Sequence, residues 1–232
     1  MMIDNYWPKF WKEHGELTSD LDEQSQVHRT LKKAPISEDA WQQTLLTLKA
    51  SLTPKSNDNL LELCAGNGLI SRYLSSQVSQ VTAVDISPHL LDKIDKVKFK
   101  NIQTIATDVR TLSFSADSFN TIIIYAGIQY FSHSEIIALL SNISVWLKKG
   151  GKLYIGDIPD LEKKWVFYST EEYQKLYFDN LKNKNNDIIG TWYEKSFMTN
   201  LSKYIGFESC DLIVQKTEFI YSDYRFDMIM KK

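Results

Sequence analysis

Residues 60–68 read Leu-Leu-Glu-Leu-Cys-Ala-Gly-Asn-Gly, a short apolar run followed by a turn of small residues. Further along, a second apolar run ends in Asp85. Glycines in such a turn let the backbone approach a ligand without a Cβ atom in the way. An acid roughly 20 residues beyond the turn is placed to accept hydrogen bonds from a ribose diol. The pattern predicts a nucleotide-binding βαβ unit.

The composition is that of an ordinary globular protein. The 232 residues fit one α/β domain, and 43% hydrophobic with 24% charged residues allow a real core. Lys and Arg total 27 against 29 Asp and Glu, so the net charge is −2. Nucleic-acid binders usually carry a basic surplus. We therefore expect no nucleic-acid partner.

Cysteine use and hydropathy indicate the compartment. Cys64 and Cys210 lie far apart and Cys64 is inside the glycine turn, so a reduced protein without a structural disulfide is expected. No apolar stretch approaches the length of a membrane span, and residues 1–11 are too polar and aromatic for a signal peptide. We expect a cytoplasmic protein that does not bind membranes. The oligomeric state is left open.

Apolar runs alternate with helix-like stretches after residue 58. Strands are expected at 59–64, 80–85, 101–106, 120–125 and 152–156, with helices at 68–76, 88–96 and 134–147. Residues 196–205 read as a helix, and 207–215 and 224–230 as an antiparallel edge pair. This order predicts a seven-stranded, mostly parallel Rossmann-like sheet with helices on both faces. Such sheets bind ligands beyond the carboxyl ends of their strands.

Two segments depart from that alternation. Residues 1–55 predict a helical N-terminal leader, in which Ser37 caps a helix carrying Trp41, Leu45 and Leu48 on one face. Residues 56–232 form the expected ligand-binding domain. Within it, the aromatic-rich stretch 158–193 follows the fifth strand and predicts a cap over the substrate, because loops at that edge commonly carry specificity.

Five motifs in order resemble those of class I S-adenosylmethionine-dependent methyltransferases. They are residues 60–68, Asp85, residues 107–109, residues 122–127 and residues 147–153. Each motif is weak alone, but their order and spacing over residues 55–232 are typical of the family. One departure stands out, since Cys64 occupies the place of the first glycine of the family's turn.

The resemblance implies S-adenosylmethionine as the cofactor and assigns roles to its expected contacts. Glu62 would face the methionine amino group, Asp85 would accept both ribose hydroxyls, and Asp108 would take the adenine amine. The remaining implied contacts are backbone at Cys64, Gly66 and Gly68, packing of Ile86 on adenine, an amide from Val109, and Tyr125 and Ala126 beside the methyl group. A plain tight turn for the glycines and a helix cap for Asp108 are the structural alternatives.

The leader carries a looser resemblance. Residues 26–30, residues 35–37 and Trp41 are similar to the leader of small-molecule methyltransferases often associated with sugar pathways. There a leader arginine commonly pairs with the cofactor carboxylate, and Arg29 fits this role, because guanidinium binds carboxylate bidentately. A solvated surface arginine is the alternative. The aromatic residues between 6 and 11 form either ordinary core or a lid.

Methyl transfer to a hydroxyl benefits from a general base. His133, after the fourth strand, is the first candidate, although it opens a helix and could face solvent. Asp157, beyond the fifth strand, is the second candidate, and His28 is the third. Tyr130 would orient the acceptor or belong to the core. No compact metal-binding constellation is found, so no metal is expected.

The sequence favours transfer to a hydroxyl of a small molecule or glycan-type acceptor. Aromatic faces suit sugar rings and apolar scaffolds, and the segment 125–130 lacks the proline clamp typical of nucleic-acid amine methylation. A methyltransferase acting on protein or RNA is the alternative. A non-catalytic or oxidoreductase nucleotide-binding βαβ domain is a further alternative. Nicotinamide enzymes normally have three glycines in the turn, however, and here Cys64 replaces one of them.

Overall fold

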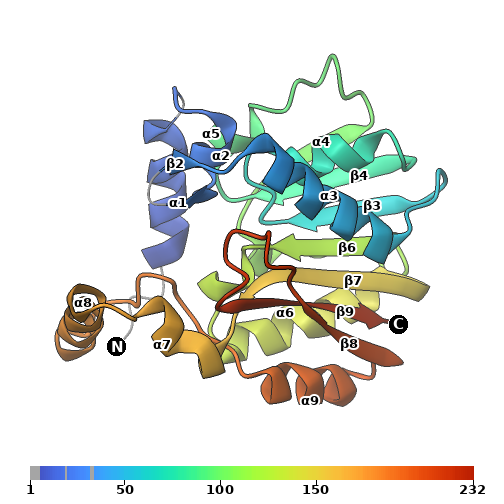
Figure 1. Cartoon of the computed structure of the whole chain (residues 1–232). Coiled ribbons are helices and arrows are strands. Elements are labelled where there is room, and N and C mark those ends of the chain that lie inside the picture. The colour runs from blue at the N-terminus through green and yellow to red at the C-terminus, as the bar shows by residue number, and fades with distance from the viewer. Residues whose placement is uncertain (1–5, 19, 32–33) are drawn as a thin grey trace.

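The structure is a computed structural model that describes residues 6–18, 20–31 and 34–232. Its centre is a seven-stranded sheet of order β5-β4-β3-β6-β7-β9-β8 (Figure 1). The strands are β3 (Asn59–Leu63), β4 (Gln80–Asp85), β5 (Ile102–Ala106), β6 (Phe119–Tyr125), β7 (Leu147–Pro159), β8 (Ser209–Val214) and β9 (Arg225–Lys231). Neighbours from β5 to β7 are parallel, and β9 runs antiparallel to β7 and β8. The expected fold class and edge pair are confirmed.

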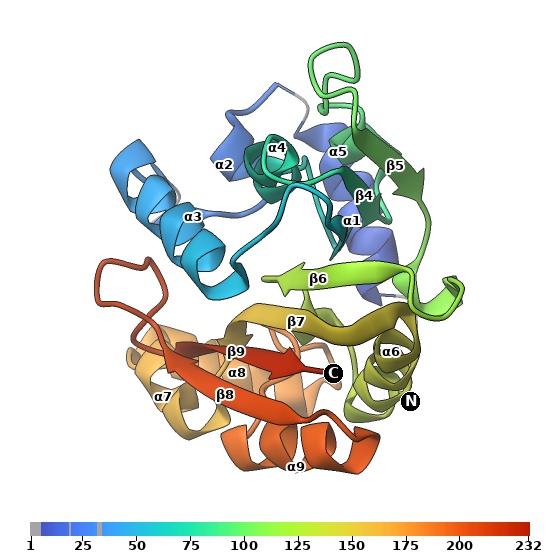
Figure 2. The same ribbon diagram turned by 90° about the vertical axis from the view of Figure 1, so that its right-hand side faces the viewer.

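Each face of the sheet has its own apolar core, because successive strand residues point to opposite sides. Leu60 and Ile123 pack with α3 (Glu38–Leu52) and α4 (Leu69–Ser75). Leu61 and Ile122 pack with α6 (His133–Trp146) and α9 (Lys195–Ile205). Figure 2 shows the two helical layers on either side of the strands. Near-continuous apolar strands follow from this double coverage.

Side-chain caps fix where the long helices begin. The Ser37 hydroxyl accepts the Ala40 N–H at the start of α3. Ser132 and Glu135 form a reciprocal capping box at the start of α6. Each cap satisfies backbone N–H groups that have no partner inside the helix. The expected helix at 196–205 begins one residue earlier, and Gly206 ends it in the left-handed conformation.

Two expected boundaries are wrong. The fifth strand of the parallel set is not confined to 152–156, since β7 starts at Leu147 and includes a left-handed turn at Gly150. The helix expected at 88–96 is the short α5 (Pro88–Leu91). Beyond it the chain continues as turns, and the Asp95 side chain accepts the N–H groups of Val97 and Lys98. Asp side chains favour such local turns over helix.

The N-terminal leader holds α1 (Tyr6–Leu17), α2 (Glu23–Gln26), the small pair β1 (Thr30–Leu31) and β2 (Ala34–Pro35), and α3. Residues 1–5, 19 and 32–33 of this predicted region lie outside the described residues. Three short 3-10 helices follow in the chain, η1 (Val109–Thr111), η2 (Ile128–Tyr130) and η3 (Leu161–Lys163).

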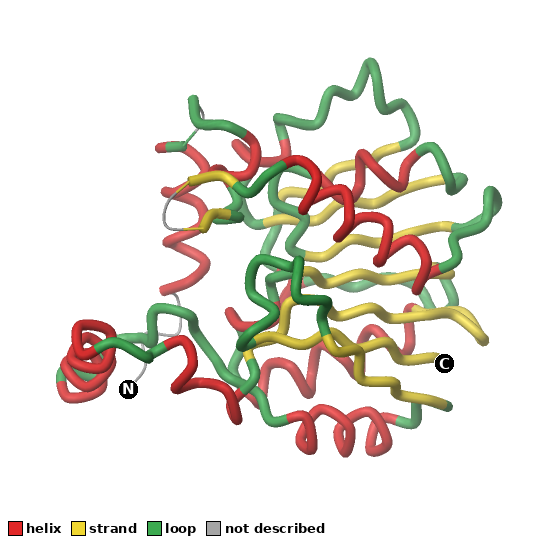
Figure 3. Tube along the Cα trace, in the orientation of Figure 1, coloured by secondary structure: helices red, strands yellow, loops and turns green. Residues whose placement is uncertain are grey.

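The aromatic stretch after β7 forms α7 (Lys164–Phe167) and α8 (Glu171–Lys182). Helix α8 buries none of its residues and projects away from the sheet (Figures 1 and 3). The division into leader, binding domain and substrate cap stays a prediction. Within the described ranges, every helix is too short or too polar to cross a membrane.

The ends of β3 and β6 interlock through Cys64 and Gly127. Cys64 has a φ of +57°, a conformation that favours glycine. A Cβ atom on Gly127 would lie 2.6 Å from Cys64 Cβ and 2.9 Å from its Sγ. The thiol side chain thus fills the space that glycine leaves open on the neighbouring strand.

This packing predicts a compensating pair of substitutions. Gly127→Ala should lower the free energy of unfolding by about 1–3 kcal/mol, because the added methyl overlaps Cys64. Cys64→Gly removes that obstacle and the strained φ, so the double variant should recover most of the loss. Denaturant unfolding of the four proteins measures the coupling. Additive effects of the two substitutions would contradict the proposed contact.

Candidate functional site

A cavity with about 830 Å³ of empty space, its mouth included, lies at the carboxyl ends of β3, β4 and β6. The strand order reverses between β3 and β6, which is the expected place for a ligand in this type of sheet. Among the lining residues are Arg29, Glu62, Cys64, Gly66, Asp85, Ile86, Asp108, Val109, Tyr125 and Ala126. The structure therefore brings together ten of the eleven residues that the sequence assigned to the cofactor.

Asp85, at the end of β4, connects two loops of the site. One carboxylate oxygen accepts the Gly66 N–H at 2.8 Å, and the other accepts the Ser87 N–H at 2.9 Å. Burial raises the pKa of this carboxyl, while these backbone N–H groups oppose the rise. A carboxylate offers about four lone-pair sites, so capacity remains for ligand hydroxyls.

Glu62 is a buried acid in the last part of β3 and accepts a hydrogen bond from the Ser71 hydroxyl of α4. Burial raises its pKa to about 7, against the lowering effects of Ser71 and Arg29. Desolvation disfavours the ionised form of a buried carboxyl. Glu62 is thus poised to change its protonation near neutral pH.

The two glycines of the turn have different tasks. Gly66, with φ +56°, lines the cavity, and a Cβ atom there would approach Val27 of the leader to 2.8 Å. Of the eleven residues assigned to the cofactor from the sequence, Gly68 is the one that does not line the cavity. It starts α4 with φ +74°, and an added Cβ would lie 2.4 Å from the Ile94 side chain. Gly68 therefore fits the structural alternative for the glycines, a plain tight turn, rather than a cofactor contact.

Arg29 comes from the leader and is 8% exposed. Its guanidinium lies 4.5 Å from the ring centroid of Trp41 and 4.4 Å from that of Tyr125. Among the described residues, no carboxylate is within ion-pair distance of it. The alternative of a solvated surface arginine is wrong, because α3 and β6 sandwich the side chain. A buried cation beside a cavity needs an anion to balance it.

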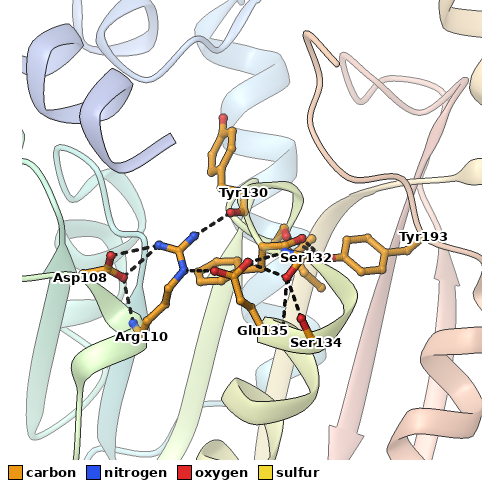
Figure 4. A network of polar contacts seen from close by, with 9 residues as sticks. Asp108, Arg110, Tyr130, Ser132, Ser134, Glu135 and Tyr193 are labelled. Atoms are coloured by element: carbon orange, nitrogen blue, oxygen red, sulfur yellow. Dashed lines mark hydrogen bonds and ion pairs between the residues drawn. The ribbon is translucent and has the colours of Figure 1, made fainter. Parts of the chain in front are cut away.

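Asp108 caps η1 by accepting the Arg110 N–H, and it also pairs with the Arg110 guanidinium at 3.0 Å. Arg110 donates further to Glu135 at 2.6 Å and to the Tyr130 carbonyl oxygen at 3.0 Å (Figure 4). The figure shows the Tyr130 ring pointing away from this network. The helix-cap alternative for Asp108 is thus present in the structure. Arg110 lines the cavity but was missed, since nothing in its sequence context sets it apart.

The leader closes one side of the cavity. Trp7, Pro8, Trp11 and Val27 line it, and the Trp7 ring lies 4.7 Å from the Tyr130 ring. Behind Trp11, His14 and His28 are in ring contact at 4.2 Å. Burial and the neighbouring His14 lower the pKa of His28 to about 4. Aromatics of α1 therefore form part of the cavity wall, and their role as a lid stays a prediction.

None of the three candidate bases, His133, Asp157 and His28, is among the residues that line the cavity. His133 is exposed on α6, with its ring 5.2 Å from Tyr193 and 4.7 Å from Phe197. This exposed position fits the alternative reading, in which His133 opens the helix and faces solvent. Asp157 is not beyond the strand but inside β7, at an irregularity of the register with φ +62°. It is buried and faces Arg225 at 3.8 Å and Gln215 at 3.3 Å. The assignment of a general base to either residue stays a prediction.

Comparison with known proteins bears on this geometry. Residues 60–151 match the family model of a methyltransferase domain. Phosphoethanolamine N-methyltransferase 1 of Triticum aestivum is 25% identical over 151 residues, covering 63% of this chain and 29% of that protein. The cypemycin N-terminal methyltransferase of a Streptomyces species is 30% identical over 115 residues, covering 48% and 46%. The chain spans less than half the length of both curated relatives.

A solved structure shares the fold across nearly the whole chain. It is phosphoethanolamine N-methyltransferase 1 of Haemonchus contortus in complex with phosphoethanolamine and S-adenosylhomocysteine. The TM-score is 0.72 at 14% identity, and the match covers 99% of this chain and 50% of that one. Residues 60–151 thus match a methyltransferase domain, and the motifs and the sheet order support a class I S-adenosylmethionine-dependent methyltransferase. The cofactor of this class is S-adenosylmethionine.

The raised pKa of Glu62 predicts a pH-dependent difference in stability between wild type and Glu62→Gln. An acid with a pKa of about 7 when folded and about 4.5 when unfolded binds more protons in the folded state between these values. The wild type therefore loses stability as the pH rises from 4.5 to 7, and the variant does not share this loss. The variant should gain on the order of 3 kcal/mol relative to wild type over that range.

Urea unfolding of the ligand-free proteins from pH 5 to pH 8 measures this difference. His14 and His28, whose lowered pKa values act in the opposite direction, are present in both proteins and cancel. Glu208→Gln, at an exposed acid before β8, is the matched control for the loss of a carboxylate outside the cavity. A constant difference for Glu62→Gln would show that its carboxyl stays ionised throughout.

Proposed function

We propose that this protein transfers the methyl group of S-adenosylmethionine to a small acceptor, with a hydroxyl as the first candidate nucleophile. The observation that carries the proposal is Arg29, a buried guanidinium that opens on the cavity without a carboxylate partner among the described residues. The methionine end of the cofactor has a carboxylate. The residues present therefore fit the group.

The proposed contacts divide the cavity into two ends. Arg29 and Glu62 would hold the carboxylate and the ammonium of the methionine end, and an ionised Glu62 favours that ammonium. Asp85 would accept the ribose hydroxyls, while Ile86, Asp108 and Val109 would surround adenine. Cys64, Gly66 and Ala126 offer a close backbone approach between the two ends.

The bound cofactor supplies an electrophilic methyl group, so the protein's contribution is to align the nucleophile and exclude water. Trp7, Trp11 and Tyr130 are placed for this task, since they wall the cavity on the leader side. Tight positioning of reactants is worth several orders of magnitude in rate. The described cavity lining contains no histidine, and we assign no general base.

The enclosure of the cavity favours a small acceptor over a folded macromolecule. Aromatic walls contributed by the leader leave room for a compact molecule, and a glycan-type ring would stack on them. An amine acceptor is the second candidate. It is supported by the names of the two curated relatives, a phosphoethanolamine N-methyltransferase and a cypemycin N-terminal methyltransferase.

Two substitutions should separate the two ends of the cofactor site. Asp85→Asn should weaken binding of both S-adenosylhomocysteine and adenosine roughly 10–100-fold, because charge-assisted hydrogen bonds to the ribose are lost. Arg29→Met keeps an apolar stem between Trp41 and Tyr125. It should weaken S-adenosylhomocysteine to a similar extent and leave adenosine unchanged. Isothermal calorimetry measures all four affinities.

Matched controls for these variants lie outside the cavity lining, on β8 and α9. Asp211→Asn on β8 and Lys203→Met on α9 remove the same charges from exposed positions. Both should bind the two ligands like wild type. Tight NAD binding by the wild type with no binding of S-adenosylhomocysteine would overturn the proposed function.

Acceptor class is tested by incubating the protein with S-adenosylmethionine and separate panels of small alcohols, glycans, amines and peptides. Mass spectrometry should detect a gain of one methyl group on a small hydroxyl compound. Methylation confined to a small amine would decide for the second candidate. Methylation confined to peptides or RNA would contradict a small acceptor.

A further inference from the structure

Arg110 connects the proposed adenine end of the cavity to the start of α6. Its side chain lines the cavity, is 26% exposed, and lies between the carboxylates of Asp108 and Glu135 (Figure 4). Nε donates to Glu135 at 2.6 Å, and Nη2 donates to the Tyr130 carbonyl oxygen at 3.0 Å. The guanidinium carbon lies 4.9 Å from the centroid of the Phe131 ring. Several contacts besides Asp108 thus hold the guanidinium in place.

Glu135 is a fixed anchor for Arg110, because the cap of α6 holds its carboxylate. One oxygen of that carboxylate accepts the Ser132 N–H at 2.7 Å and the Ser132 hydroxyl at 2.8 Å. The other oxygen accepts the Arg110 Nε–H. A capping box restricts both of its side chains, since each one satisfies a backbone N–H of the other residue. The start of α6 therefore sets where the guanidinium lies.

The Asp108 carboxylate is oriented by Arg110 from two directions. Its Oδ1 accepts the Arg110 backbone N–H at 3.0 Å and the Arg110 Nη1 at 3.1 Å, and its Oδ2 is 3.0 Å from the same Nη1. These bonds fix the rotation of the carboxylate. A carboxylate has about four lone-pair positions, so Oδ2 keeps the capacity to accept a donor from a ligand in the cavity.

We propose that Arg110 is a positioning residue that orients Asp108 toward the exocyclic amine of adenine and so sets the preference of the cavity for an adenine nucleoside. This inference rests on the proposed function, which places Asp108 beside adenine, and adds the residue that controls this contact. Nε, Nη1 and Nη2 of Arg110 all donate to protein acceptors. Arg110 therefore acts through Asp108. A carboxylate locked in this way loses little freedom when it binds a ligand.

The test compares adenosine with purine riboside, which is the same nucleoside without the exocyclic amine. Isothermal calorimetry measures both affinities, and their ratio reports the amine contact. Wild type should bind adenosine about tenfold more tightly, the equivalent of one hydrogen bond to a charged group. A general loosening of the cavity weakens both nucleosides and leaves the ratio unchanged. The ratio therefore separates a positioning role from a merely structural one.

Three variants test the role of Arg110 in this ratio. Arg110→Met removes the guanidinium and should lower the preference for adenosine to about twofold, because the Asp108 carboxylate is free to rotate. Arg110→Lys keeps the charge but not the planar fork that bridges two carboxylates, and should lower the preference to about threefold. It keeps the test valid if Arg110→Met does not fold. Asp108→Ala should abolish the preference, and the double variant with Arg110→Met should match it.

Arg72→Met is the matched control for the loss of an ion-paired arginine. Arg72 pairs with Glu23 at 2.7 Å and does not line the cavity that contains Arg110. This variant should keep the wild-type ratio of the two affinities, even if the contact between α4 and the leader is weaker.

The outcomes separate the two proposals. If S-adenosylhomocysteine does not bind to wild type, the proposed function fails together with this inference. If it binds, but the cavity shows no preference for adenosine over purine riboside, only the positioning role is refuted. A full wild-type preference in Arg110→Met or Arg110→Lys would also refute it. The same holds for a preference that persists in Asp108→Ala, because the amine would then be bound by another group.

Discussion

The candidate site depends on the carboxylate of Asp85. Its two oxygens accept backbone N–H groups from the turn after β3 and from the turn after β4, so one side chain sets the relative position of both loops. Because it is buried, these bonds form in a low-dielectric environment where they are stronger than in water. Removal of the carboxylate would therefore disturb the walls of the cavity as well as any contact to a ligand.

The rest of the enclosure depends on the attachment of the leader to the domain. The Asn67 side chain of the glycine turn donates to the Glu23 carbonyl oxygen at 2.8 Å and to the Gln26 side chain at 3.0 Å. On the other side, the Tyr221 hydroxyl lies 2.9 Å from the carbonyl oxygens of His28 and Thr30. These bonds join the leader to both the glycine turn and the loop before β9. They carry Arg29 and the α1 aromatics to the carboxyl edge of the sheet.

Strain and unpaired polar groups gather at this same edge. Cys64, Ala126 and Asp157 all have positive φ, and each stands where a strand ends or loses its register. Such conformations persist when the surrounding structure over-determines them, and they concentrate at functional sites. The buried indole N–H of Trp11 adds to this pattern, because no acceptor among the described residues meets hydrogen-bond geometry with it. The edge is thus shaped for contact with a ligand at the expense of local stability.

Local sequence patterns determined the sheet, its helices and most of the residues that line the candidate site. The apolar runs and the glycine turn are local signals, and Asp85 follows at a distance fixed by one helix and one strand. A parallel arrangement then places all carboxyl ends at one edge, which is why ten of the eleven assigned residues line a single cavity. The extent of β7 and the early end of α5 escaped prediction, because strand pairing with β9 and side-chain turns decided them.

Tertiary structure alone decided the other side of the site. Arg110 has no distinguishing sequence context, and its importance comes from partners far away along the chain. His133 follows a strand at the promising edge, yet the capping box of α6 turns it outward to solvent. Asp157 sits in a register irregularity that no local pattern reveals. The sequence encodes what each segment prefers, whereas burial and pairing between distant segments choose which polar groups face the cavity.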